Sequence, residues 1–348
     1  MKLGGVQTRS IMRTEDGRGV RILDQRRLPW AITWVGLHTP EQAATAIREM
    51  WTRGAPQLAL TGADGLAMAL ADDASDESLA RNHAMLLATR PTAVNLRWAL
   101  DAVRDAVLPL PEVERAAAAF SRVDAICDED VGLCRAIGEH GLALLQSLHA
   151  KHPGRPLNIL THCNAGWLAT ADYGTATAPI YIAHDTGIPV HVWVDETRPR
   201  NQGALLTAFE LSEHGVPHSV VVDNAGGHLM MRGQVDAVIV GTDRVTANGD
   251  VCNKIGTYLK ALAAHDNGVP FYVALPYTTF DPQTATGADI VIEERDDFEV
   301  THVASENGDV RVTQSAGYNP AFDVTPSRLV TGYITERGIL SSAELSVA

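Results

Sequence analysis

The stretch Leu157-Asn-Ile-Leu-Thr-His-Cys-Asn-Ala-Gly166 decides how this chain is interpreted. It is a short apolar run that ends in a thiol and then breaks into a turn of small residues. An apolar run of this length bounded by turn residues is typical of a buried strand. A strand in an open α/β sheet delivers its last residue to the crevice where ligands bind. Cys163 is therefore a candidate for chemistry, although a single cysteine after a strand usually packs as a small buried hydrophobe.

The sequence that follows this stretch alternates short apolar runs with helix-like segments. The runs predict strands at residues 157–162, 190–194, 218–222, 237–241 and 271–275. Strands that alternate with helices in this way predict a parallel, doubly wound sheet whose helices cover both faces. We therefore expect a Rossmann-like domain.

The N-terminal half has a different pattern. Short strands are expected within residues 18–36, and Thr39-Pro-Glu-Gln42 opens a helix with a capping threonine and a proline at its first position. From there to about residue 150 the pattern is helical and rich in alanine. The polar segment Lys151-His-Pro-Gly-Arg-Pro156 marks a boundary. The fold class expected is α/β, with a strand-edged helical domain at 1–150 and a Rossmann-like catalytic domain at 151–348.

Composition excludes several classes of protein. The chain has 348 residues, 45% of them hydrophobic and 20% charged, which suits two globular domains. A net charge of -14 argues against a nucleic-acid partner. No apolar run approaches the roughly 20 residues that span a bilayer, and the N-terminus lacks a secretory pattern. The expectation is a cytoplasmic protein with no membrane partner. Its 4 cysteines are too sparse for a disulfide scaffold and lack CxxC metal spacing, so no metal is expected.

A nucleotide cofactor is not indicated by the glycine-rich turns. None of them gives G-x-G-x-x-G after a strand, and none gives the phosphate loop G-x-x-x-x-G-K-[ST]. The nearest approach, Asn224-Ala-Gly-Gly227, is interpreted as a tight turn that leads into a helix. A nicotinamide-dependent oxidoreductase fits the topology but lacks the fingerprint, and we expect no cofactor.

Asp243 is the second candidate for chemistry. It follows the apolar run Ala237-Val-Ile-Val-Gly241, where a second strand is expected to end. A helix cap or an ion pair with Arg244 is the alternative interpretation. Because Cys163 and Asp243 each follow a strand of one predicted sheet, thiol and carboxyl could divide the proton transfers of one reaction. A pocket that excludes water would raise the pKa of such a carboxyl.

Four further segments carry groups that bind anions. They are Arg53-Gly-Ala-Pro56, Arg90-Pro-Thr-Ala93, Glu196-Thr-Arg-Pro-Arg-Asn-Gln-Gly203 and Asn253-Lys-Ile-Gly256. The last is expected to open a helix, so that backbone N–H groups, an amide and an ammonium converge on one phosphate. Solvated arginines are the alternative for the first two. Together the segments suggest a small phosphorylated substrate.

These motifs occur together and in order in one known family. With Gly241-Thr-Asp-Arg244, Ala247-Asn-Gly-Asp-Val-Cys-Asn-Lys-Ile-Gly-Thr257 and Asn319-Pro-Ala-Phe-Asp-Val-Thr-Pro326, the chain resembles the 5-methylthioribose-1-phosphate isomerase family from about Leu23 to Gly338. That family is related to the alpha, beta and delta subunits of eukaryotic initiation factor 2B. The resemblance implies an aldose–ketose isomerase of methionine salvage that needs no cofactor and is commonly a homodimer.

The resemblance also implies roles for individual residues. Asp243 matches the family's proton donor, and Cys163 matches its partner at the reacting carbons. The positions that match substrate and phosphate contacts are Arg53, Gly54, Ala55, Arg90, Gln202, Asn253 and Lys254. No metal ligand is implied.

Three departures from the family pattern leave the substrate open. Thr242 stands where alanine is usual, Asn201 stands where an apolar residue is common, and Ala225-Gly-Gly227 replaces a turn that contains methionine. None removes a reactive group. The alternatives are an isomerase of 5-deoxyribose 1-phosphate or ribose 1,5-bisphosphate, or a non-catalytic regulatory subunit of the same fold. The choice between proton transfer through an enediol and a hydride shift also stays open.

Overall fold

The structure is a computed structural model that describes residues 1–90 and 93–347, and the chain divides into two compact units. Unit 1 consists of Met1, Gln7–Cys134 and Trp167–Gly174, and unit 2 consists of Lys2–Val6, Arg135–Gly166 and Thr175–Ala348. The long helix α5, Glu112–Ala150, contributes residues to both units. The domain boundary near residue 150 therefore stays a prediction.

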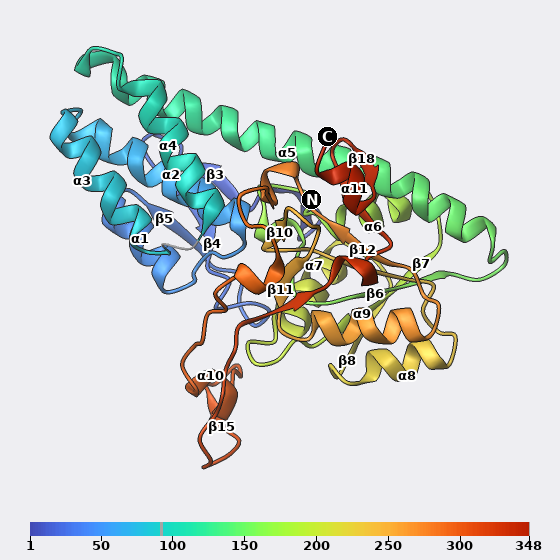
Figure 1. Cartoon of the computed structure of the whole chain (residues 1–348). Coiled ribbons are helices and arrows are strands. Elements are labelled where there is room, and N and C mark those ends of the chain that lie inside the picture. Colours follow the sequence, from blue (N-terminus) through green and yellow to red (C-terminus); the bar gives the residue numbers. More distant parts are fainter. Residues whose placement is uncertain (91–92, 348) are drawn as a thin grey trace. The chain divides into compact units, whose positions relative to one another are not determined.

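Unit 1 combines a small antiparallel sheet with a group of helices (Figure 1). The sheet has the order β3-β4-β5. Its strands and the helices that follow are β3 Ile11–Arg13, β4 Val20–Leu23, β5 Trp34–Leu37, α1 Pro40–Arg48, α2 Ala55–Asp72, α3 Asp76–Leu87 and α4 Val94–Val107. The predicted helix start is confirmed, because the Thr39 side chain accepts the backbone N–H of Gln42 and Pro40 lies in the first turn.

Helix α2 forms the centre of unit 1. Nearly every side chain from Gln57 to Leu70 is buried, because α2 is apolar around most of its circumference. It packs against α1, α3 and α4. Its N-terminus, at Gly54, is thereby held in a fixed position within the unit.

Unit 2 is built on a seven-stranded sheet with the order β18-β17-β12-β9-β6-β7-β8. The strands are β6 Leu157–Thr161, β7 Val190–Asp195, β8 His218–Val221, β9 Ala237–Val240, β12 Phe271–Ala274, β17 Gly332–Thr335 and β18 Gly338–Leu340. All neighbours pair in parallel except β17 and β18. The five strands expected after residue 156 are confirmed to within one residue at their ends. The order of the six parallel strands is that of a doubly wound nucleotide-binding fold.

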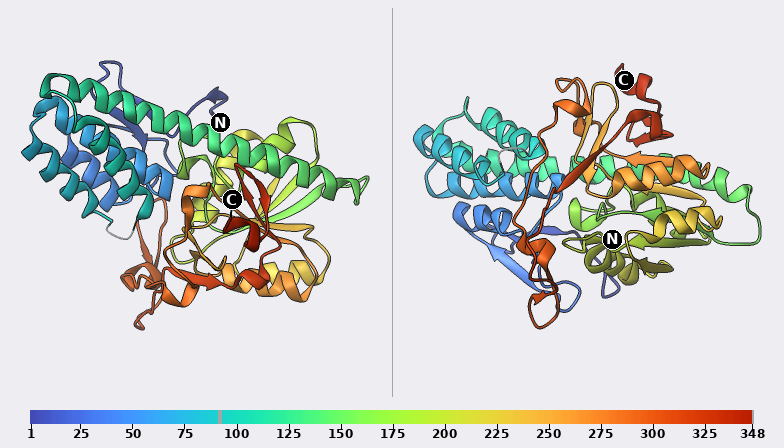
Figure 2. Two further views of the ribbon diagram at one scale, coloured as in Figure 1. Left: turned by 45° about the horizontal axis from the view of Figure 1, so that its top comes forward. Right: turned by 60° about the horizontal axis from the view of Figure 1, so that its bottom comes forward.

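The alternation of strand-like and helix-like segments predicted helices between the strands of this sheet, and unit 2 contains them. They are α6 Ala178–Asp185, α7 Ala208–His214, α8 Ala225–Met231 and α9 Thr257–Asp266. Helices α8 and α9 lie side by side, as both views of Figure 2 show, and α9 packs on β9 and β12. None of the helices in the described part of the chain is both long and apolar enough to cross a membrane.

A second, four-stranded sheet in unit 2 has the order β13-β10-β11-β16. Its strands are β10 Arg244–Thr246, β11 Val251–Lys254, β13 Phe280–Asp281 and β16 Phe322–Thr325. Other elements of unit 2 are β1 Lys2–Leu3, α10 Phe298–Thr301, β14 His302–Val303, β15 Val310–Arg311 and α11 Ser342–Leu345, while β2 Val6–Gln7 has one residue in each unit. The chain passes from the parallel sheet to the second sheet between β9 and β10, which is where Asp243 lies.

Candidate active site

Cys163 and Asp243 follow two neighbouring strands at the point where the order of the sheet reverses. Cys163 comes two residues after β6 and Asp243 three residues after β9, and these strands pair in parallel. From β6 the chain winds outward to β7 and β8, and from β9 it winds in the opposite direction to β12 and β17. Ligands of open α/β sheets bind outside the carboxyl ends of the strands at such a switch point. The fold therefore brings both candidates to one edge of one sheet.

The loops that carry these two residues pack against each other. A Cβ added to Gly241, just after β9, would lie 2.5 Å from the Cβ of Ala165 in the loop after β6. Atoms cannot approach so closely, so only glycine fits at position 241. The contact holds the Asp243 loop directly against the Cys163 loop.

The backbone of Cys163 is in the left-handed conformation, with φ 66°. Its N–H donates to Thr197 Oγ1 at 2.8 Å, and its carbonyl oxygen accepts from Thr207 Oγ1 at 2.7 Å. Thr207 belongs to a short π-helical turn, Gly203–Thr207. The thiol-bearing residue is half-buried.

Two of the other cysteines are unsuited to acid–base chemistry. Burial, with the neighbouring Asp243 charge as a smaller cause, raises the pKa of Cys252 to about 12. Burial likewise raises the pKa of Cys127 to about 12, although the nearby Arg9 opposes the shift. Cys134 is fully buried in unit 1. Among the cysteines, Cys163 is the one that combines partial exposure with a place at the carboxyl edge of the sheet.

Asp243 is held through its backbone and has an exposed side chain. Its N–H donates to the carbonyl oxygen of Cys252 at 3.0 Å. The neighbouring Arg244 forms its ion pair with Asp281, at 3.4 Å. The sequence suggested that this carboxyl would lie in a pocket without water, and in the structure Asp243 is exposed.

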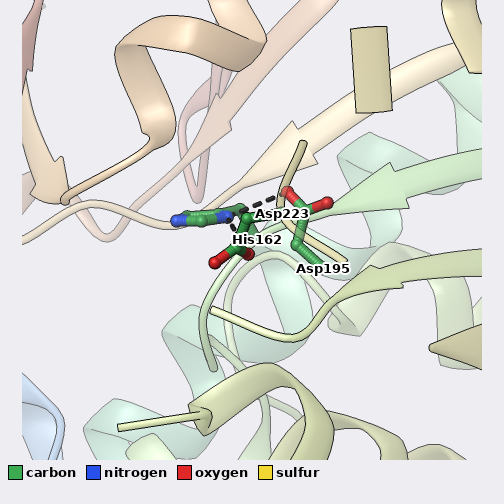
Figure 3. A group of neighbouring side chains, drawn as sticks. All are labelled: His162, Asp195 and Asp223. Carbon is green, nitrogen blue, oxygen red and sulfur yellow. Dashed lines mark hydrogen bonds and ion pairs between the residues drawn. The ribbon is translucent and has the colours of Figure 1, made fainter. Parts of the chain in front are cut away.

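His162, which precedes Cys163 in the chain, lies close to Asp195 and Asp223 (Figure 3). His162 and Asp195 are buried, and Asp223 is half-buried. His162 Nδ1 lies 2.9 Å from Asp195 Oδ2 and 4.0 Å from Asp223 Oδ1, and His162 Nε2 lies 2.8 Å from the carbonyl oxygen of Ile255. The ammonium of Lys260 lies 3.2 Å from the same oxygen of Asp195. The cluster ties the end of β6 to the end of β7 and to the segment after β11.

His162, Asp195 and Asp223 are residue types that bind metals, and their ligand atoms lie within 4.8 Å of one another. Each is already engaged within the chain. The two oxygens of Asp223 accept the N–H groups of Thr197 and Arg198, both at 2.8 Å, and Lys260 supplies a positive charge at Asp195. We therefore interpret the cluster as an internal charge network that holds the Cys163 loop.

Asn253 and Lys254 lie in strand β11 and do not open a helix as the sequence suggested. The amide of Asn253 donates to Thr257 Oγ1 at 3.0 Å. The Lys254 ammonium donates to the carbonyl oxygen of Ala321 at 2.9 Å and lies 4.3 Å from the centre of the Phe322 ring. Both side chains are buried.

Helix α9, which follows, begins at Thr257, and its N-terminus is taken by a side chain of the protein. The Asp323 carboxylate accepts the N–H of Gly256 at 2.7 Å and that of Tyr258 at 3.2 Å. The prediction that these N–H groups bind a phosphate is therefore wrong, because a carboxylate already satisfies them. Burial raises the pKa of Asp323, and the two N–H donors offset part of that rise.

Gln202 immediately precedes the π-helical turn and is buried, with 6% of its surface exposed. Its amide oxygen is buried without a hydrogen-bond partner among the residues described. The arginines of the same segment are engaged elsewhere. Arg198 donates to the carbonyl oxygen of Val300 at 2.8 Å, and Arg200 lies 2.8 Å from Glu299, so both hold α10.

The remaining predicted contacts lie in unit 1. Gly54 precedes α2 with φ 95°, and a Cβ there would lie 2.6 Å from backbone atoms of Ala169. Ala55 begins the helix, and no side chain caps it. Arg53 and Arg90 are both half-buried, and Arg90 follows α3. Pro91 and Thr92 of the second arginine motif lie outside the described residues.

Sequence reasoning missed the residues that support Cys163. His162, Asp195, Thr197, Thr207 and Lys260 belong to segments that are far apart in the chain and meet only in the folded sheet. One signal was present. Asp195 ends a strand as an acidic residue after an apolar run, just as Cys163 and Asp243 follow theirs.

Comparison with known proteins places this arrangement in a family. The initiation factor 2 subunit family matches residues 51–342. The methylthioribose-1-phosphate isomerase of Rhizobium meliloti is 60% identical over 348 residues, which cover 97% of this chain and 96% of the relative.

Two solved structures share the fold over nearly the whole chain. The 5-methylthioribose 1-phosphate isomerase of Pyrococcus horikoshii has a TM-score of 0.85 at 37% identity and covers 96% of this chain and 92% of its own. The delta subunit of translation initiation factor eIF-2B from A. fulgidus has a TM-score of 0.82 at 37% identity and covers 96% of both chains. The chain belongs to the initiation factor 2 subunit family and, within it, to the methylthioribose-1-phosphate isomerases.

Proposed function

We propose that this protein is an aldose–ketose isomerase that converts 5-methylthioribose 1-phosphate into 5-methylthioribulose 1-phosphate in methionine salvage. The observation that carries the proposal is the position of a thiol and a carboxyl, Cys163 and Asp243, after neighbouring strands at the switch point of the sheet. An identity of 60% to a methylthioribose-1-phosphate isomerase along nearly the full length supports the same reaction.

The reaction must open a furanose ring whose anomeric carbon carries phosphate. In the proposed mechanism Asp243 protonates the ring oxygen while its bond to carbon one breaks. The hydrogen of carbon two moves to carbon one, and the hydroxyl of carbon two gives its proton back to the Asp243 carboxylate as carbon two becomes the ketone. Atoms and charges then balance without a redox partner. Cys163 either carries that hydrogen as a proton or lines the path of a hydride shift.

The exposed carboxyl of Asp243 fits a role as acid once substrate is bound. A sugar phosphate lying over the carboxyl edge of the sheet would remove water from it. Loss of water raises the pKa of a carboxyl, so a larger fraction of Asp243 would carry the proton to be donated at neutral pH in the complex than in the free enzyme.

We propose the remaining family positions as substrate contacts. The guanidinium groups of Arg53 and Arg90 suit a phosphate, and so do the uncapped N–H groups at the start of α2 by Gly54 and Ala55.

Three contacts are proposed from unit 2. The buried amide oxygen of Gln202, which has no hydrogen-bond partner in the described part of the chain, would accept from a sugar hydroxyl. The ammonium of Lys254 would donate to the substrate phosphate. Asn253, beside it in β11, would donate through its amide.

A regulatory subunit is the second candidate, because the delta subunit of a translation initiation factor has a TM-score of 0.82, against 0.85 for the Pyrococcus isomerase, at the same 37% identity. The presence of both Cys163 and Asp243 favours the enzyme. We further propose a cytoplasmic homodimer that uses no cofactor, on the strength of the family resemblance, and light scattering of the purified protein would test the dimer.

A side-by-side assay of purified protein tests the substrate. We expect kcat/KM to be highest for 5-methylthioribose 1-phosphate, ahead of 5-deoxyribose 1-phosphate and ribose 1,5-bisphosphate. A difference of one apolar group at carbon five corresponds to roughly 10- to 200-fold in this ratio. Preference for either competitor would reassign the substrate. If none of the three sugar phosphates is turned over, the regulatory subunit would be favoured.

A further inference from the structure

The conformation of Cys163 is unusual for a residue with a side chain. Its φ of 66° lies in the left-handed region, where the Cβ of an ordinary residue crowds its own backbone. Such conformations persist only where the surroundings impose them. The value of φ also sets the direction of the Cα–Cβ bond, and it therefore sets where the thiol is carried.

Two threonine hydroxyls hold this conformation. Thr197 Oγ1 accepts the N–H of Cys163, and Thr207 Oγ1 donates to its carbonyl oxygen. Strand β6 ends at Thr161, so the sheet ladder does not extend to these backbone groups. Both threonines are 1% exposed or less, which keeps water from taking their place.

The two hydroxyls are themselves fixed in orientation. Each has one hydrogen to donate. Thr197 donates its hydrogen to the carbonyl oxygen of Asp195 at 3.0 Å, which leaves the oxygen lone pairs for Cys163. Thr207 donates to Cys163 and accepts from the amide of Asn164 at 3.2 Å.

Thr197 is anchored through its backbone as well. It has a φ of 64°, and its N–H donates to Asp223 Oδ1 at 2.8 Å. A Cβ added to Gly203 would lie 1.7 Å from the carbonyl oxygen of Asp195 and 3.0 Å from Thr197 Oγ1. The π-helical turn therefore lies directly against the segment that carries Thr197.

We propose that Thr197 and Thr207 are positioning residues that hold Cys163 in its left-handed conformation and so aim the thiol at the reacting carbons. This inference rests on the proposed isomerase function. Without either hydroxyl, Cys163 relaxes toward negative φ and its sulfur moves. A displacement of about 1 Å at a reacting group costs roughly 100-fold in rate.

The test compares Thr197→Val and Thr207→Val with the serine variants Thr197→Ser and Thr207→Ser, which keep the hydroxyl. Thr335→Val is the matched control. Thr335 is fully buried in β17, and its hydroxyl donates to the carbonyl oxygen of Gly338 at 2.9 Å and accepts the N–H of Arg337 at 3.1 Å. Like the other two threonines, Thr335 is buried and its hydroxyl both donates and accepts a hydrogen bond, but neither bond involves Cys163.

Four quantities are measured for each variant. They are kcat and KM for 5-methylthioribose 1-phosphate, the rate at which iodoacetamide alkylates Cys163 as followed by peptide mass spectrometry, and φ of Cys163 in a crystal structure. We expect each valine variant to lose about 10- to 100-fold in kcat with KM within about threefold. The alkylation rate should change by at least about threefold, and the serine variants and Thr335→Val should stay near wild type.

Valine variants that keep kcat, alkylation rate and φ near wild type would overturn the inference, and so would serine variants that are as impaired as the valine ones. If a valine variant does not fold, the smaller Thr197→Ala and Thr207→Ala are judged by the same measurements. Should the wild-type protein lack isomerase activity, the proposed function fails, while alkylation and φ still decide whether the threonines position Cys163.

Discussion

His162 Nδ1 and Asp195 Oδ2 lie 2.9 Å apart, and both side chains are fully buried next to the residue that carries the candidate catalytic thiol. The same carboxylate lies 3.2 Å from the ammonium of Lys260, which is also buried. A buried carboxylate with these partners links β7 to the end of β6 and to helix α9. These contacts hold the segment that carries Cys163 to the neighbouring strand and to α9.

Removal of the charge of Asp195 should destabilise the fold. Asp195→Asn leaves the Lys260 ammonium buried beside a neutral amide, and breaking a buried pair in this way costs about 3–5 kcal/mol. Urea denaturation at pH 7 measures the loss. Asp185→Asn is the control, because Asp185 pairs with His214 at 3.0 Å but is 53% exposed, and it should cost less than about 1 kcal/mol. Equal losses in the two variants would contradict the network, and adding Lys260→Met to Asp195→Asn should recover part of the stability.

Gly54→Ala should destabilise unit 1 through two separate effects. The φ of 95° costs an alanine about 1–2 kcal/mol, and the clash of its Cβ with Ala169 adds roughly 1–3 kcal/mol. Gly17→Ala isolates the first effect, because Gly17 has φ 70° and nothing within 4 Å of an added Cβ. Thermal unfolding monitored by circular dichroism compares the two. If Gly54→Ala costs no more than Gly17→Ala, the close approach to Ala169 is not limiting.

The sequence predicted much of the fold because the signals it used are local. Each of the five strands after residue 156 is an apolar run between turn residues, and the start of α1 depends on Thr39 and Pro40, which are neighbours in the chain. The identity of Cys163 and Asp243 as candidates followed from the same strand ends. Parallel order was predicted from the alternation, but the adjacency of β6 and β9 required the structure.

The features that the sequence did not predict depend on contacts between distant segments. The segment Asn253-Lys-Ile-Gly256 was expected to begin a helix. Pairing with β16 instead places Asn253 and Lys254 in strand β11, and Asp323 of β16 accepts the N–H of Gly256 at the start of α9. The left-handed conformation of Cys163 has no local signal, because cysteine is not a residue that favours it. It follows from two threonines that lie 34 and 44 residues further along the chain.

Two buried carboxyls of unit 1 should make stability depend on pH. Burial raises the pKa of Asp64 and of Asp130 to about 6, although Arg13 opposes the shift for the first and the N–H of Ala171 for the second. A carboxyl whose pKa is higher in the folded than in the unfolded state binds more protons when folded, so stability falls as pH rises from about 4 to about 6.

Asp130→Asn should remove its share of this pH dependence. A rise in the pKa of Asp130 from 3.8 to about 6 corresponds to roughly 3 kcal/mol, so the variant should gain up to that amount at pH 7 relative to pH 4. Urea denaturation at both pH values measures the change. Glu139→Gln, at an exposed position of the same helix, is the control and should leave the pH dependence unaltered. An Asp130→Asn variant with the wild-type pH dependence would contradict the shift.

Asp243→Asn and Cys163→Ser should each lower kcat by about 100- to 10,000-fold with little change in KM, because the proposed mechanism gives each group a role in the transition state. Steady-state kinetics on 5-methylthioribose 1-phosphate measure both constants. Cys252→Ser is the matched control for the thiol, since the pKa of Cys252, about 12, keeps it protonated. Near-normal turnover in either of the first two variants would remove that residue from the mechanism.

The route of the hydrogen between carbon two and carbon one can be read from isotope exchange. If Cys163 carries it as a proton, a thiol that is half-exposed at the edge of the sheet exchanges with solvent, and product formed in deuterated water should contain deuterium at carbon one. If the hydrogen moves as a hydride, it never leaves carbon, and the product should retain the substrate hydrogen completely. Mass spectrometry of the product gives the fraction. The two routes also give Cys163 different roles. Under the hydride route, Cys163→Ser should keep more turnover than Asp243→Asn. Under the proton route, Cys163→Ser should lose more turnover than Asp243→Asn, because serine is a far weaker acid than a thiol.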